Sequence, residues 1–302
     1  MQSQMGAVEP LAIPSASGSS TGRRLRKAFR LVRGYPLGAL GLAVVLLMFL
    51  VAIFAPLIAT HPVDQGSGDA ILLPPSGEHF FGTDEYGRDV FSRVVYGARV
   101  SLYIGFGSVA VGMVAALLLG MISAYAGGFV DTVFQRFIDA AMAFPPLVFL
   151  LVLASVFGSG VWQLILALGI LGAFRNTRVI RAAVLSVAST QYVEAARVLG
   201  ASNTRILLRH VLPNIFGPTM VVATVWLGVA IISESSLSYL GLGIQPPTPS
   251  WGRMLSDLRP FMLQVPAVVM FPGIAIAVTV FAFNVLGDAL RDILDPRMRG
   301  AR

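Results

Sequence analysis

Very few side chains in this sequence could do chemistry, and those that could are not grouped as a catalytic site requires. A phosphate-binding loop needs a lysine after its glycine-rich turn, whereas the only lysine, Lys27, lies in an arginine cluster without glycines. No hydrolytic triad and no histidine-rich metal motif is recognisable, and the absence of cysteine excludes disulfides and thiolate metal sites. The sequence therefore predicts a chain that is not an enzyme, does not hydrolyse ATP itself and binds no cofactor.

Two histidines and two carboxylates need individual interpretation. His61 and His79 lack the spacing of a metal-ligand motif, so we expect both to be solvated and no metal to bind. Asp139 lies one turn from Arg136, which favours an interfacial ion pair. For Glu234 two interpretations stand about equal: a satisfied interfacial carboxylate, or part of a water-filled route through the membrane. On the second interpretation the candidates for the translocation path are Ser233, Glu234, Ser235 and Ser238.

The segment 189–213 lies between two apolar stretches and has the pattern of two short helices separated by a break. Ser189 or Thr190 can cap the first helix, Gly200 can end it in the left-handed conformation, and Pro213 is expected to stop the second. Small side chains beside the break allow another protein to come close. The residues that we expect to form this contact are Glu194, Ala195, Ala196, Gly200, Leu212 and Pro213.

The composition is that of a membrane protein, with 56% hydrophobic and 12% charged residues. About 20 apolar residues cross the hydrocarbon core as a helix. Six candidate spans result: 37–59, 100–125, 137–158, 161–175, 215–238 and 266–287. The fourth is short and, taken alone, could be re-entrant, but without it the arginines of 175–209 would lie outside, against the positive-inside rule. We therefore expect six spans with both termini in the cytoplasm, and no binding of nucleic acid.

Small residues recur every four positions along the second span and predict one helix face that packs closely on a neighbour. They are Ser108, Gly112, Ala116, Gly120, Ala124 and Gly128.

Two segments lie outside in this topology. The first ends in an amphipathic stretch around Val90 and Val94, which we expect to form a helix lying at the outer interface. The second, 241–252, is too rich in glycine and proline for a regular helix, and its Trp251 is expected at the lipid headgroups.

These motifs resemble a known family. The segment 189–213 is similar to the EAA loop of bacterial ABC importer permeases, with His210 where the consensus has isoleucine. The runs 82–93, 240–252 and 283–296 resemble the second, C-type, permease subunit of the dipeptide, oligopeptide and nickel importers. The resemblance covers the chain from about residue 34 to its end.

The resemblance implies an all-α integral membrane protein with six transmembrane helices, the type I ABC importer (MetI-like) permease fold. Together with the composition and the charge pattern of the N-terminal residues, it indicates four parts. Residues 1–33 would be a disordered basic cytoplasmic tail, and 34–97 the first transmembrane helix and an external loop with an interfacial helix. Residues 98–290 would be the MetI-like core with its coupling loop at 189–213, and 291–302 a cytoplasmic tail.

The implied function is the permease subunit of an ATP-driven importer that moves di- or oligopeptides across the bacterial cytoplasmic membrane by alternating access. The implied partners are a paralogous permease, two ABC ATPase subunits that hold ATP and Mg, an extracytoplasmic solute-binding protein, the peptide and the lipid bilayer. The candidates for contact with the binding protein are Asp84, Arg88, Asp89, Gln245 and Trp251.

Several alternatives remain at this point. Nickel or glutathione import would use the same architecture. An ion-coupled secondary transporter or channel would need a charged relay at the membrane midplane, and the span centres here are bare. A membrane scaffold or enzyme anchor would not need the glycine-broken segment at 189–213.

Overall fold

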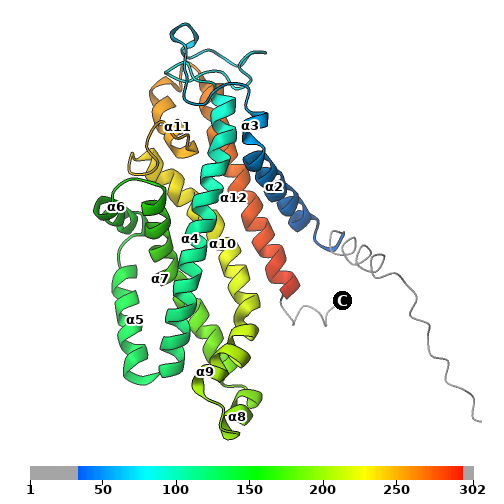
Figure 1. The fold of residues 1–302 in the computed structure, drawn as a ribbon, viewed down its shortest axis with the longest axis vertical. Coiled ribbons are helices and arrows are strands. Elements are labelled where there is room, and N and C mark those ends of the chain that lie inside the picture. Colours follow the sequence, from blue (N-terminus) through cyan, green and yellow to red (C-terminus); the bar gives the residue numbers. More distant parts are fainter. Residues whose placement is uncertain (1–32, 295–302) are drawn as a thin grey trace, which may run out of the picture. The chain divides into compact units, whose positions relative to one another are not determined.

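The computed structural model describes residues 33–294, so the predictions for the basic N-terminal tail and for 295–302 lie outside the described residues. The chain divides into two units after Pro36, and the architecture below is that of the second, Leu37–Arg302. Five of its helices are long and apolar enough to cross a membrane: α2 (Pro36–Ile53), α4 (Val90–Ala126), α7 (Val161–Ala188), α10 (Leu212–Tyr239) and α12 (Pro266–Leu294) (Figure 1). The shorter elements are α3 (Ala55–Ile58), η1 (Gly68–Ala70), α8 (Gln191–Val198), α9 (Asn203–Ile206), η2 (Leu207–Val211), α11 (Trp251–Leu258) and η3 (Arg259–Phe261).

The third predicted span, 137–158, is not one continuous helix. The chain forms α5 (Gly128–Met142) and α6 (Pro146–Phe157), which meet at 93°. Pro145 and Pro146 explain the break, since proline supplies no backbone N–H and disfavours helical backbone in the residue before it. Residues 33–294 therefore contain five uninterrupted helices long and apolar enough to span a membrane, or six spans if the bent pair counts as one.

Two ion pairs join α5 to α7. Asp139 pairs with Arg178 of α7, so the predicted partner Arg136 is wrong. Asp131 accepts from both ends of the Arg181 guanidinium, with Arg181 Nε 2.7 Å from Asp131 Oδ1. The weak fourth span is thus a full 28-residue helix whose arginines hold its bent neighbour.

The small-residue face of the second span is confirmed at five of its six positions. Ser108, Gly112, Ala116, Gly120 and Ala124 are all buried in α4, whereas Gly128 lies beyond its end. A Cβ on Gly112 would come within 2.9 Å of the Gly169 carbonyl oxygen of α7. Only glycine allows the two backbones this approach, and α4 and α7 form the most extensive helix pair in the fold.

The predicted interfacial helix around Val90–Val95 does not exist as a separate element. It forms the first turns of α4, which runs unbroken for 37 residues and so crosses the predicted boundary at residues 97 and 98. The apolar side chains of these turns, Val90 and Val95, are buried against the rest of the fold rather than directed to lipid.

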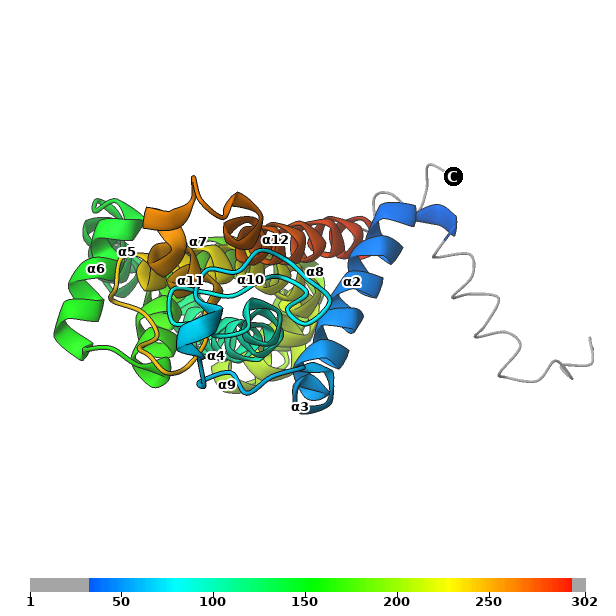
Figure 2. The same cartoon turned by 90° about the horizontal axis from the view of Figure 1, so that it is seen from above.

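The other helices lie on several sides of α4 (Figures 1 and 2), while one face of it, with Val114, Leu118 and Ile122, stays exposed. In both views α5 and α6 lie on one side of α4 and α2 on the other. Arg99 of α4 fixes the end of α2 by donating from Nε to the Ala52 carbonyl (2.9 Å) and from the guanidinium to the Ile53 carbonyl (3.2 Å). These carbonyls would otherwise lack a helical partner.

Candidate functional site

The segment 189–213 folds as two short helices with a glycine between them. Gly200 has φ +82°, and the bonds Gly200 N–H to Arg197 O and Ala201 N–H to Ala196 O, both 3.0 Å, make a Schellman end to α8. The predicted left-handed glycine is confirmed. The predicted cap of α8 is wrong, because the Thr190 hydroxyl donates to the Val187 carbonyl (2.6 Å) and accepts no backbone N–H.

We call the segment from α8 through α9 the handle, residues 191–206. Val193 and Ile206 anchor it, since neither has any exposed surface. They pack in an apolar cluster with the ends of α4, α7 and α10, formed by Ala116, Met121, Ala124, Ile180, Val184, Val211 and Ile215. The Tyr125 hydroxyl of α4 donates to Asn203 Oδ1 (3.1 Å). A displacement of the handle must therefore move these helix ends.

The opposite face of the handle is open. Glu194 and Ala195 are exposed, as the sequence predicts. Beside them Val198 is 87% and Leu199 86% exposed, a degree unusual for aliphatic side chains next to arginines in a polar helix. These two residues are not among the sequence-based candidates. The signal available in the sequence was their place at the end of α8, directly before Gly200.

Pro213 does not stop the second short helix. Residues Asn203–Tyr239 run on as one helical path, and Pro213 lies in the first turn of α10. The reason is η2, a π-helical turn in which the Leu212 N–H bonds to the Leu207 carbonyl five residues back. A proline ring normally clashes with the carbonyl four residues before it. The wider turn moves that carbonyl aside.

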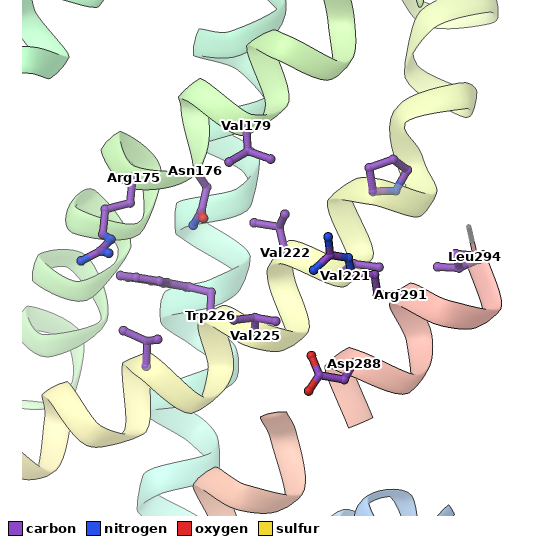
Figure 3. Close-up of a pocket in the computed structure, with 12 residues that line it drawn as sticks. Arg175, Asn176, Val179, Val221, Val222, Val225, Trp226, Asp288, Arg291 and Leu294 are labelled. Carbon is purple, nitrogen blue, oxygen red and sulfur yellow. The ribbon is translucent and has the colours of Figure 1, made fainter. Parts of the chain in front are cut away.

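A pocket of about 600 Å³ lies between α7, α10 and α12 (Figure 3). Its wall on α10 is apolar, and its charged groups come from the other two helices. The lining residues are Arg175, Asn176 and Val179 of α7, Pro218, Val221, Val222, Val225, Trp226 and Val229 of α10, and Asp288, Arg291 and Leu294 of α12. None of these is a sequence-based site candidate, because residues up to 119 positions apart in the sequence line the pocket together.

Trp226 is the largest group in this pocket. Its ring lies over Gly172, where a Cβ would come within 2.4 Å of the indole nitrogen. The Arg175 guanidinium lies 5.9 Å from the ring centroid. The indole Nε1 is buried and has no hydrogen-bond partner among the described residues. The pocket thus offers an aromatic face and charges of both signs.

Glu234 lies away from this pocket and inside the chain. It is 1% exposed, and its Oε1 accepts from Ser238 Oγ (2.8 Å) and from Ser250 Oγ (2.9 Å) of the loop before α11. Ser235 and Ser238 are buried too, and Ser233 is half-buried. The assignment of these four to the translocation path stays a prediction. Their burial favours the other interpretation, a satisfied carboxylate that fastens the loop to α10.

Asp84, next to α11, organises a tight loop. Its Oδ1 accepts from the backbone N–H groups of Tyr86 and Arg88, both at 2.9 Å, and its Oδ2 from Arg88 Nε at 2.7 Å. The Arg93 guanidinium lies 3.5 Å away and donates to the Val63 carbonyl. Asp84 and Arg88 are 3% and 9% exposed. The structure does not support contact with a partner through these two side chains.

Asp89 is likewise internal, with 1% exposure. It caps α4 by accepting from the Ser92 N–H (2.8 Å) and hydroxyl (2.7 Å), and its Oδ1 lies 2.9 Å from His79 Nδ1. Burial opposes ionisation of Asp89, but these hydrogen bonds outweigh it and hold its pKa below the usual value. His79 is also buried, and its ring lies against that of His61, tilted by 34° with ring centroids 4.7 Å apart. The prediction of a solvated His79 is therefore wrong.

Trp251 does not lie at the lipid headgroups. It is 1% exposed, its Nε1 donates to the Val94 carbonyl (2.9 Å), and its ring contacts Gly97 of α4. It joins α11 to α4, and this burial does not favour its predicted contact with the binding protein, which stays a prediction. Gln245 is exposed and is the one docking candidate that the structure leaves accessible.

Comparison with known proteins identifies two family models. The model described as the binding-protein-dependent transport system inner membrane component matches residues 116–300, which include the handle and the pocket. The model described as the N-terminal TM domain of oligopeptide transport permease C matches residues 24–75.

Individual relatives match nearly the whole chain. The dipeptide transport system permease protein DppC of Alkalihalophilus pseudofirmus is 39% identical over 91% of this chain and 90% of its own. The oligopeptide transport system permease protein OppC of Bacillus subtilis is 38% identical over 88% of each chain. The glutathione transport system permease protein GsiD of Escherichia coli is 42% identical over 85% of each.

Proposed function

The chain belongs to the family of binding-protein-dependent transport system inner membrane components, and from this premise we propose that it is one half of the pore of a peptide importer. As a member of that family it is a multi-pass, non-catalytic permease subunit of an ABC importer. We further propose that a paralogous permease supplies the other half. Two ATPase subunits would hold ATP and Mg in the cytoplasm, and a solute-binding protein would deliver the substrate outside.

The handle is the observation that carries this proposal. Its outer face combines Glu194, small alanines and the exposed Val198 and Leu199. Its inner face is fixed to α4, α7 and α10 through Val193 and Ile206. A groove on an ATPase that receives the apolar outer face would move these three helices together. This is the mechanical link that ATP-driven alternating access requires.

We propose that the pocket between α7, α10 and α12 is this chain's share of the translocation path. A peptide in solution has a carboxylate, an ammonium group and side chains that are often apolar. Arg175 and Arg291 could form ion pairs with the carboxylate, and Asp288 could pair with the ammonium group. The valines and Trp226 could contact the apolar side chains. The pocket reaches the end of α12, so a partner on that side would complete its wall.

Peptides are the substrate class that two of the three relatives' names support. Glutathione, named for the third, is itself a small peptide with the same charged groups. A secondary transporter is not favoured, because Glu234 is bound within the fold by serines and does not face the pocket.

The function is tested by purifying the chain with its partners in mild detergent and reconstituting the complex in vesicles. We expect two ATPase chains and one paralogous permease to accompany it, and peptide-loaded binding protein to stimulate ATP hydrolysis and uptake. A transport-competent homo-oligomer without any ATPase would refute the proposal.

The path is tested by a single cysteine, since the chain contains none. Val225 lines the pocket and is 39% exposed. Val225→Cys in the assembled complex should react with a small thiol reagent, and transported peptide should slow the reaction. Val152→Cys, exposed on α6 away from the pocket, is the matched control and should show no protection. Equal protection at both positions, or at neither, would place the path elsewhere.

A further inference from the structure

His61, Glu78 and His79 come together at the outer segment between α3 and α4. One potential ligand atom of each side chain lies within 4.8 Å of those of the other two. The residues belong to two stretches separated by the loop 62–77, which explains why their sequence spacing gave no metal motif. We propose that these three side chains bind one divalent ion of a late transition metal, in the group of zinc, nickel and copper.

The hydrogen bonds around both imidazoles involve Nδ1 and leave the Nε2 atoms free to bind a metal. Asp89 can only accept, so His79 carries its proton on Nδ1, 2.9 Å from Asp89 Oδ1. The Thr60 hydroxyl donates to Asp89 Oδ2 (3.3 Å) and therefore accepts from His61 Nδ1 (3.0 Å). Each ring then has its Nε2 lone pair free. A carboxylate behind the imidazole N–H is the common support of metal-bound histidines.

The support is rigid before any ion binds. The side chain of Asp89 has no exposed surface and also accepts from the N–H and hydroxyl of Ser92. The Ser92 hydroxyl accepts in turn from the backbone N–H groups of Thr60 and His61 (3.1 and 3.0 Å). The first turn of α4 thus fixes the two histidines, while the exposed Glu78 is free to rotate onto an ion.

The ligand set selects the class of ion. Two neutral imidazoles and one carboxylate suit zinc, nickel and copper, whereas calcium and magnesium prefer oxygen ligands alone. Three protein ligands leave a fourth position for water or for a ligand of another molecule. Binding would join the two ends of the loop 62–77 and reduce the motion of the outer segment. The proposal does not depend on what the chain transports.

The test uses the full chain purified with a tag that contains no histidine, then stripped with a chelator. Zn²⁺ titrated by calorimetry should bind at one ion per chain, and should raise the thermal unfolding temperature of the protein. The Co²⁺ form should show the visible absorption of a four-coordinate site. Because the chain has three histidines and no cysteine, few other side chains compete with the proposed site for Zn²⁺.

The key variants avoid the buried residues. The side chain of His61 is 33% exposed, so His61→Asn should fold and yet bind Zn²⁺ at least about tenfold more weakly. Glu78→Gln should weaken binding in the same direction. The matched controls are His210→Asn, the third histidine, and Asp64→Asn, an exposed acid of the same loop. Both should bind as the unmodified chain does.

Three outcomes would overturn the proposal: no saturable binding at micromolar Zn²⁺, undiminished binding in His61→Asn, or an equal loss in His210→Asn. None of these would affect the assignment of the chain as a permease subunit, which is tested by its partners and by uptake.

Discussion

The handle and the outer segment around Asp84 and Asp89 both carry a distinctive sequence motif, yet they present it in opposite ways. In the handle Glu194 faces solvent, whereas Val193 and Ile206 are buried and Ala201 packs against the same apolar cluster. In the outer segment the charged motif residues are buried in internal hydrogen bonds. The charged motif of the handle is available to a partner. The charged residues around Asp84 and Asp89 instead fix the conformation of the loop before α4, whose surface a partner would contact.

The largest expected effect concerns which side of the membrane each region occupies. We predict that Ser67→Cys, exposed in the outer segment, reacts with a membrane-impermeant thiol reagent applied to spheroplasts. Thr204→Cys, exposed in the handle, should react only after the membrane is opened. Labelling of Thr204→Cys in sealed spheroplasts would reverse the orientation and with it the assignment of both regions.

Next in size is the loss of a buried charge. Asp84→Ala leaves Arg93 without its carboxylate, leaves Arg88 only the longer contact to Glu85 (3.5 Å), and leaves two backbone N–H groups without an acceptor. We expect the free energy of unfolding, measured in mixed micelles, to fall by about 3–5 kcal/mol. Asp64→Ala, an exposed acid nearby, should change it by less than about 0.5 kcal/mol. Normal stability with selective loss of binding-protein contact would instead make Asp84 a docking residue.

In the handle the expected cost is smaller and of another kind. Gly200→Val forces a β-branched residue to φ +82°, which costs about 1–3 kcal/mol of local strain. No heavy atom lies within 4 Å of the added Cβ, so packing is unaffected. We predict normal insertion and abundance, but reduced uptake and reduced stimulation of ATP hydrolysis.

Asparagine tolerates this backbone conformation better than other residues with a Cβ, so Gly200→Asn is the matched control. It should retain most of the uptake. If Gly200→Val transports normally, the shape of the handle does not matter for coupling.

The smallest effect on stability is expected at the exposed pair. Val198→Ser with Leu199→Ser should alter the free energy of unfolding by no more than about 0.5 kcal/mol, because neither side chain is buried. The affinity for the ATPase subunits, measured by binding in detergent, should nevertheless fall at least about tenfold. Thr204→Ala, exposed on the same handle, is the control. An unchanged affinity in the double variant would remove Val198 and Leu199 from the interface.

The sequence predicted features that depend on local pattern. The all-helical membrane fold, the small-residue face of α4 and the left-handed Gly200 follow from hydropathy, four-residue spacing and glycine chemistry. What it missed depends on contacts between distant residues. The contact between the His61 and His79 rings, the Asp139–Arg178 pair and the pocket all join stretches that only the folded chain brings together.

Two predictions, for Trp251 and Pro213, are wrong because they rest only on the general preference of the residue type. Trp251 was assigned to the lipid interface because tryptophan favours it, but Gly97 leaves a gap on α4 that the ring fills. Pro213 was taken as a helix stop because its ring clashes with the preceding turn, but η2 widens that turn. In both cases a neighbouring backbone feature determined the outcome.

That widened turn has a consequence for how motion travels along the chain. A π-helical turn holds about one residue more than an α-helical one, and one residue of α-helix corresponds to about 100° of rotation and 1.5 Å of rise. The turn at Leu207–Val211 therefore sets the angular phase between α9 and the pocket wall of α10. Tightening it to α-helical geometry would twist Trp226 about the axis of α10 relative to α9. A change in the hydrogen bonding of this short stretch would therefore rotate the pocket wall on α10 relative to the handle.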